Sequence, residues 1–190
     1  FVLFGLHWGF VPIMINDLST QGYSLLSGPL MAAVLAQAAA ALAVTLRSRS
    51  AKRREVAGPG AVSGFVAGVT EPAIYGVNLP LKVPFYSGIA GGALGGAIAS
   101  VGGSAANGFV FPSLLAIPAY MTVGNFALQM IGTTIAIVIG FVGTFVFASR
   151  EQPDIEDASD PVPATETIAV AAGSTIALGA PVAGTVVPLA

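Results

Sequence analysis

The stretch SLLSGPLMAAVLAQAAAALAVTL, Ser24 to Leu46, contains no charged residue. At about 1.5 Å of rise per residue it predicts a helix that crosses the roughly 30 Å hydrocarbon core of a bilayer. A basic cluster follows at once, made of Arg47, Arg49, Lys52, Arg53 and Arg54. Basic clusters beside a span stay on the cytoplasmic side, so we expect this helix to run from the outside to the inside.

The rest of the composition also favours lipid as the solvent. Hydrophobic residues make up 55% of the chain and charged residues only 8%, against about 25% in an ordinary soluble domain. No Asp, Glu, Lys or Arg occurs from Val83 to Ser149. Two further spans are predicted there, Tyr86–Ala106 and Val123–Ala148. The fold class expected is an all-α polytopic membrane protein.

The first of these two spans is rich in small residues. Gly88, Gly92 and Gly96 recur at four-residue spacing, which lets two helices approach closely in lipid. This spacing fits a close-packed transporter helix and equally fits ordinary small-residue packing.

Several classes of chemistry are excluded. The chain has no cysteine and one histidine, so it offers no disulfide, no thiolate nucleophile and no cluster of cysteines or histidines for a metal. It contains no P-loop, no HExxH and no nucleophile elbow. The net charge is −2 and the basic residues are clustered, so we expect no nucleic-acid partner and no cofactor.

The C-terminal part has a different composition. Residues 151–167 begin EQPDIEDASD and combine prolines with carboxylates, which predicts a water-exposed linker. Residues 168–190 contain short Val, Ile and Thr runs broken by Gly and Pro, which predict the β-rich start of a soluble domain. The chain begins at Phe1, not Met, and both ends lie in apolar runs, so we interpret it as an internal fragment.

A count of crossings decides how two other apolar stretches are interpreted. Arg54 and Arg150 are both expected on the cytoplasmic side, and the two predicted spans between them already return the chain to that side. Ala61–Leu81 and Phe109–Tyr120 are therefore predicted to be re-entrant hairpins or interfacial segments, since the second is also too short to span. Because a residue before proline avoids helical dihedrals, we expect the first to break at Thr70–Pro72.

Glu71 would then lie at the tip of a hairpin. It is the only acidic residue between Glu55 and Glu151, and a carboxylate at membrane depth costs roughly 2.5–3.5 kcal/mol. One interpretation is that it accepts hydrogen bonds from a polyhydroxylated or cationic ligand. The alternatives are a structural ion pair with Lys82 and a tip that touches lipid headgroups.

Three other residues are candidates for the same site. His7 lies in the apolar stretch FVLFGLHWGFVPIMIN, either as a ligand-binding group or as a structural histidine. Trp8 is either an interfacial anchor or a platform for a sugar ring. Asn78 follows Glu71 at a spacing that is not diagnostic.

Two motifs add a family resemblance. GVTEPAIYGVNLPLKVPF, Gly68 to Phe85, and GLHWGFVPIMIN, Gly5 to Asn16, resemble the membrane (IIC) domain of bacterial phosphoenolpyruvate-dependent sugar phosphotransferase permeases. The likeness is strongest to the β-glucoside branch of the glucose superfamily, with sucrose and trehalose permeases near by. GAPVAGTVVPLA at the end of the chain resembles the opening strand of a IIA domain.

The resemblance implies group translocation, in which a sugar is phosphorylated as it crosses the membrane by a protein-N-phosphohistidine-sugar phosphotransferase. By motif position Glu71 and Thr70 would contact sugar hydroxyls and His7 would line the same site, with Glu71 or His7 as a possible base. The phosphoryl group would pass from HPr through a IIA histidine and a IIB cysteine. The family also implies a homodimer in the bacterial inner (plasma) membrane, multi-pass, with its C-terminus in the cytoplasm.

The domain boundaries follow from this resemblance. Residues 1–150 would be the C-terminal part of the IIC domain, 151–167 a linker and 168–190 a truncated start of IIA. The IIB cysteine and the IIA histidine are both missing, so the fragment alone is expected to be inactive. Two rivals remain, an ion-coupled secondary transporter with Glu71 as its coupling carboxylate, and a non-catalytic membrane protein with a structural Glu71–Lys82 pair.

Overall fold

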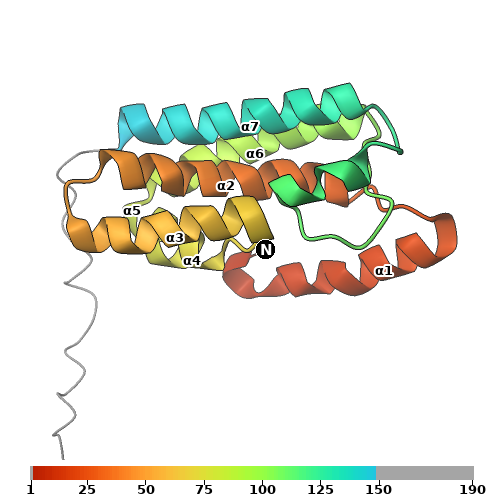
Figure 1. Ribbon diagram of the computed structural model, residues 1–190, viewed down its shortest axis with the longest axis horizontal. Helices are drawn as coiled ribbons and strands as arrows, with labels where there is room; N and C mark the ends of the chain where they lie inside the picture. Colours follow the sequence, from red (N-terminus) through yellow and green to blue (C-terminus); the bar gives the residue numbers. More distant parts are fainter. Residues whose placement is uncertain (1, 149–190) are drawn as a thin grey trace, which may run out of the picture. The chain divides into compact units, whose positions relative to one another are not determined.

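The computed structural model describes residues 2–148, which fold as helices joined by short connections and contain no strand (Figure 1). The chain divides into two units, Phe1–Glu156 and Asp157–Ala190, and every described residue belongs to the first. The linker predicted at 151–167 and the β-rich start predicted at 168–190 lie outside the described residues. An all-helical arrangement is therefore confirmed for residues 2–148.

Three long helices lie side by side: α2 (Ser27–Arg47), α6 (Val83–Val101) and α7 (Phe126–Phe147) (Figure 1). Among the described residues α2 and α7 are the two helices long and apolar enough to cross a membrane, so two of the three predicted spans, Ser24–Leu46 and Val123–Ala148, are helices of membrane length. The third predicted span is also a helix, but it begins at Val83 and ends at Val101 instead of Ala106. Its glycines lower its mean hydropathy, and it is not one of those two helices.

Glycines on two faces of α6 explain why these helices pack so closely. Toward α2, a Cβ on Gly92 would lie 2.8 Å from the Cα of Ala33, and one on Gly88 would overlap the Gln37 amide. Toward α7, a Cβ on Gly95 would overlap the carbonyl oxygen of Gly132. The close approach expected from Gly88, Gly92 and Gly96 is confirmed, and α6 makes a second close contact with α7 on another face.

A helical hairpin packs against α2 on its other side. Its first arm is α3 (Ala51–Ala67), which Ser50 caps by accepting a hydrogen bond from the Arg53 amide at 3.3 Å. Its second arm is one continuous helical segment, residues 71–81, made of α4 (Glu71–Ala73), the π-helical η3 (Ile74–Asn78) and α5 (Leu79–Leu81). The hairpin expected within Ala61–Leu81 is therefore present, but α3 begins at Ala51 and includes part of the basic cluster.

The break in this hairpin differs from the prediction at Thr70–Pro72. The chain turns at Gly68, whose φ of 73° is a left-handed conformation that glycine adopts without strain. Glu71 is the first residue of the second arm and not an isolated tip. Pro72 is tolerated in the first helical turn because the amide hydrogens there have no intrahelical partner. The proline therefore marks the start of a helix.

The remaining segments lie around the ends of the long helices. Two short 3-10 turns, η1 (Val2–Phe4) and η2 (Leu6–Gly9), lead into α1 (Phe10–Gln21). After α6 an irregular loop and the 3-10 helix η4 (Leu114–Tyr120) replace any span over Phe109–Tyr120, as expected from its short length. The Tyr120 hydroxyl donates to the Ser27 carbonyl oxygen at 3.1 Å, which fixes this segment to the start of α2.

Candidate functional site

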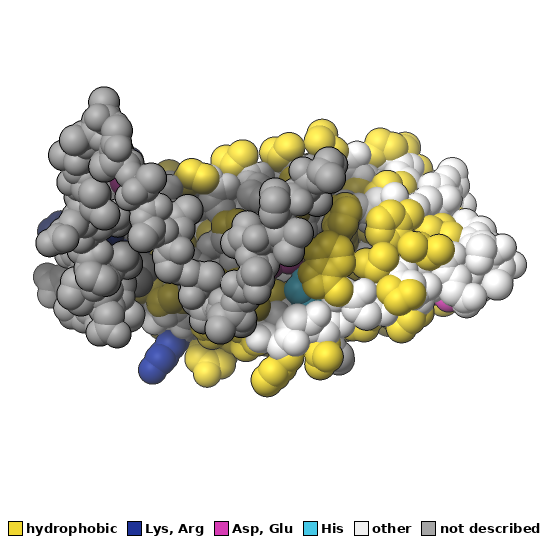
Figure 2. Space-filling model, turned by 90° about the horizontal axis from the view of Figure 1, so that it is seen from below, with side chains coloured by type: hydrophobic (Ala, Val, Ile, Leu, Met, Phe, Trp, Pro, Cys, Tyr) yellow, Lys and Arg dark blue, Asp and Glu magenta, His cyan; other side chains and the backbone are white. Residues whose placement is uncertain are grey.

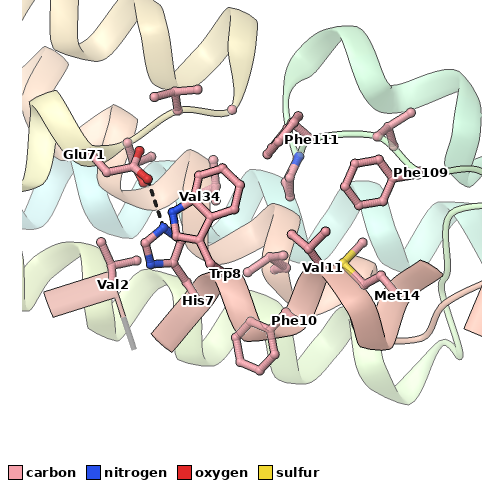
Figure 3. Close-up of a pocket in the computed structure, with 16 residues that line it drawn as sticks. Val2, His7, Trp8, Phe10, Val11, Met14, Val34, Glu71, Phe109 and Phe111 are labelled. Atoms are coloured by element: carbon pink, nitrogen blue, oxygen red, sulfur yellow. Dashed lines mark hydrogen bonds and ion pairs between the residues drawn. The ribbon is translucent and has the colours of Figure 1, made fainter. Parts of the chain in front are cut away.

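The two motif segments meet at a pocket of about 170 Å³ (Figure 3). Its walls come from four parts of the chain: the first residues up to Met14, the α2 side chains Leu30 and Val34, the hairpin turn 68–71 and the loop 109–112. Most of the lining is apolar. This volume is below the roughly 300–1,000 Å³ of typical small-molecule pockets.

A histidine and a carboxylate meet inside the pocket. The Nε2 atom of His7 lies 3.0 Å from the Oε1 atom of Glu71, and the close-up shows the two side chains pointing toward each other (Figure 3). Their side chains are 22% and 36% exposed, so a ligand in the pocket can reach them. The His7 Nδ1 atom is buried and has no hydrogen-bond partner among the described residues. In the space-filling view the histidine lies at the surface beside hydrophobic side chains (Figure 2).

The backbone around His7 is anchored to the hairpin. Gly5 precedes η2 with a φ of 69°, which lets the chain turn tightly into His7. The Tyr75 hydroxyl, on the same helical segment as Glu71, donates to the Val2 carbonyl oxygen at 2.7 Å. The N-terminal segment, residues 2–7, is therefore bound to the second motif at two points.

Thr70 and Trp8, two of the candidate site residues, also line the pocket. Thr70 is 5% exposed and its carbonyl oxygen accepts from the Ile74 amide at 2.8 Å, so it starts the helical segment. Trp8 is 59% exposed, and its ring is tilted against the His7 ring with 5.7 Å between ring centroids. Trp8 therefore presents an open aromatic face beside the His7–Glu71 pair.

Two aromatic residues that line the pocket lie outside both sequence motifs. Phe109 and Phe111 come from the loop after α6 and meet edge to face at 5.8 Å between centroids (Figure 3). Their loop packs against the hairpin turn, because a Cβ on Gly68 would lie 2.5 Å from the Pro112 carbonyl oxygen and 3.2 Å from the Phe111 carbonyl carbon. The one sequence signal for them is the pattern FVF before Pro112, which places two aromatic side chains in an apolar stretch too short to span the membrane.

Asn78 does not line this pocket. Its side chain is fully buried, and its Nδ2 atom donates to the Gln37 carbonyl oxygen at 3.0 Å and to the Gln37 Oε1 atom at 2.8 Å. Within residues 2–148 the carboxylate of Glu71 pairs with His7 and not with Lys82. Lys82 lies at the opposite end of the helical segment, where its φ of 59° joins α5 to α6.

Comparisons with known proteins agree with the two motifs. Residues 1–92 match the family model "Phosphotransferase system, EIIC". The chain is 39% identical over 171 residues to the "PTS system beta-glucoside-specific EIIBCA component" of Dickeya chrysanthemi, covering 87% of this chain and 27% of that protein. The protein of the same description from Bacillus subtilis (strain 168) is 37% identical, covering 80% of this chain and 25% of its own length.

A sucrose-specific relative is similar to the same degree. The "PTS system sucrose-specific EIIBC component" of Bacillus subtilis (strain 168) is 37% identical, covering 80% of this chain and 33% of that protein. No solved structure matches the chain. The chain spans about a quarter of the length of the two β-glucoside relatives. Over residues 1–92 the chain is similar to the phosphotransferase system EIIC family.

Proposed function

We propose that this chain is the C-terminal part of a sugar-translocating membrane domain and that the pocket around His7 and Glu71 binds the sugar. The observation that carries the proposal is the 3.0 Å contact between these two residues, which joins the two motif segments at one cavity. The His7–Glu71 pair is accessible from a largely apolar pocket, as in sites that orient a ligand with a few polar groups.

The chemistry of the lining suits a sugar. The Glu71 carboxylate can accept hydrogen bonds from two hydroxyl groups, and the imidazole of His7 can donate or accept one more. Trp8, Phe109 and Phe111 offer apolar ring faces on which the C–H face of a pyranose can pack. Either Glu71 or His7 has the chemistry to accept the proton of the hydroxyl that is phosphorylated.

The substrate class comes from the relatives. Two of them are described as β-glucoside-specific and one as sucrose-specific, so a glucoside is the substrate we propose, with a β-glucoside first. The partners proposed are phosphorylated IIB and IIA domains with HPr upstream, and a second copy of the chain as homodimer. Residues 1–150 would be the IIC part, 151–167 the linker and 168–190 the start of IIA.

The long helices support a place in the bacterial inner membrane. Helices α2 and α7 are long and apolar enough to cross it, and large apolar side chains along α7, among them Ile131, Val138 and Val142, are about half exposed. The exposed apolar face of α7 would contact lipid. The hairpin α3–α5 and the segment 109–120 would then be re-entrant parts, of which residues 68–71 and 109–112 line the pocket.

Transport by the intact protein tests the proposal. Membrane vesicles that contain the full-length protein are loaded with HPr and the other soluble phosphotransferase proteins and given a labelled β-glucoside outside. We expect sugar phosphate to accumulate inside only when phosphoenolpyruvate is supplied inside. Uptake of unmodified sugar that ignores phosphoenolpyruvate and stops when the proton gradient is dissipated would contradict group translocation and favour an ion-coupled transporter.

A further inference from the structure

A pair of amide side chains lies buried outside the pocket, between α2 and the helical segment that carries Glu71. Asn78 is fully buried and Gln37 is 7% exposed. The Asn78 Nδ2 group donates to both the carbonyl oxygen and the Oε1 atom of Gln37, at 3.0 and 2.8 Å. The Gln37 Nε2 group donates to the Phe85 carbonyl oxygen at 3.3 Å. Two amides thus link α2, η3 and α6.

Stability alone does not account for this choice of residues. The Asn78 Oδ1 atom is buried and has no hydrogen-bond partner within residues 2–148. A buried acceptor without a partner is costly, whereas two apolar side chains of similar shape can replace a buried hydrogen-bonded pair at little cost. Hydrogen bonds have preferred distances and angles, which apolar contacts lack. The amides therefore constrain how the helical segment 71–81 is oriented relative to α2.

The pair lies close to the pocket along both elements. On α2, Leu30, Val34 and Gln37 follow one another at the spacing of a single helix face, and the first two line the pocket. On the hairpin, Asn78 ends the π-helical η3 that follows the first turn after Glu71. A π-turn is wider than an α-turn and rotates the residues on its two sides relative to each other; such turns are frequent at functional sites.

We propose that Asn78 and Gln37 are positioning residues that fix the rotation of the helical segment 71–81, so that the Glu71 carboxylate faces His7 and the sugar. The inference rests on the proposed function of the pocket. Without the amide bonds the segment would still pack against α2 through Val77 and Leu81, but that apolar contact does not fix its rotation.

A double substitution separates positioning from stability in the full-length protein. In Asn78→Leu the Gln37 amide loses a partner, so we expect a lower melting temperature and at least tenfold weaker binding of the β-glucoside. In Gln37→Met/Asn78→Leu no amide is left unpaired, so the melting temperature returns toward that of the wild type. We expect the affinity of this double variant to stay at least tenfold below that of the wild type.

Gln129→Met is the matched control. Gln129 is also a fully buried glutamine that donates to α2, at the Gly28 carbonyl oxygen, but it is not in contact with the pocket. We expect this substitution to lower the melting temperature and to leave the affinity within twofold of the wild type. Should Asn78→Leu fail to fold, Gln37→Met alone keeps the bond to the main-chain oxygen and should weaken binding about threefold.

Two results would overturn the inference: wild-type affinity in the stable double variant, or wild-type affinity in Gln37→Met when Asn78→Leu does not fold. Glu71→Gln, measured alone, tests the pocket itself. If Glu71→Gln weakens binding and the amide variants do not, the positioning role is wrong and the proposed site stands. If Glu71→Gln leaves binding unchanged, the proposed site is wrong.

Discussion

The imidazole of His7 and the carboxylate of Glu71 lie 3.0 Å apart although 64 positions separate them in the chain. This contact closes the pocket between the N-terminal motif and the hairpin. The Tyr75 hydroxyl of the hairpin adds a second bond by donating to the carbonyl oxygen of Val2, which precedes that motif. The geometry of the pocket therefore depends on long-range pairs that can each be tested.

Replacing Glu71 by Gln removes the negative charge and keeps the shape of the side chain. A hydrogen bond to a charged group is worth about 1.5–3 kcal/mol, so the affinity for the β-glucoside should fall roughly 10- to 150-fold in the intact protein. Isothermal calorimetry on the purified protein measures this change. Glu55→Gln, an exposed carboxylate on α3, is the control and should bind normally. Equal affinities in the two variants would remove Glu71 from the site.

Trp8→Ala tests whether the exposed indole contacts the ligand. Aromatic packing contributes about 0.5–1.5 kcal/mol beyond buried area, which corresponds to a roughly two- to tenfold loss of affinity. Trp8→Phe keeps an aromatic face and should lose less than twofold. An interfacial anchor would give a different pattern, with both variants binding sugar like the wild type.

Gly95→Ala tests the contact between α6 and α7. The new Cβ would overlap the Gly132 carbonyl oxygen, which belongs to the backbone and cannot rotate away. Overpacking of this kind costs about 1–3 kcal/mol, so the melting temperature in detergent should drop. Gly58→Ala on α3 is matched in helix propensity, and its Cβ would lie 3.6 Å from a Thr45 methyl group, an ordinary contact. A stable Gly95→Ala protein would show that the two helices can separate freely.

Gly68→Ala tests the turn of the hairpin. The φ of 73° is strained for alanine, and the Cβ would lie 2.5 Å from the Pro112 carbonyl oxygen in the pocket wall. The turn would have to shift, which would move Thr70 away from the pocket wall formed by residues 109–112. We therefore expect a lower melting temperature and about tenfold weaker sugar binding. Gly22→Ala is the control: Gly22 also has a positive φ, 80°, but a Cβ there would have no atom within 4 Å. This variant has the backbone strain without the clash, so we expect it to bind sugar normally. If both variants bind sugar equally well, the turn does not shape the site.

The sequence predicted the long helices well because each rests on a local property. The uncharged run to Leu46 and the one to Ala148 each exceed the length of a bilayer core, and the helices α2 and α7 follow them. The end of α6 was missed by several residues because Gly102 and Gly103 stop the helix before the apolar run does. Apolar composition alone does not show where a helix ends.

The pocket was predicted only in part. His7, Trp8, Thr70 and Glu71 meet there, as their motifs suggested, whereas Asn78 belongs to the same motif but faces α2. A π-turn between Glu71 and Asn78 decides which side each residue faces, and no local signal in the sequence encodes it. Phe109 and Phe111 reach the pocket through a loop whose course is set by tertiary contacts, such as the bond of Tyr120 to Ser27.

The glycine faces of α6 have a mechanical consequence. Where backbone meets backbone, as at Gly95 and Gly132, no side chain is present whose rotation could absorb a displacement. The three-helix layer is therefore stiff, and α2, α6 and α7 must move as one body. Any opening of the pocket would then be taken up outside that layer, at the two junctions that join the hairpin to it, residues 48–50 before α3 and Lys82 before α6.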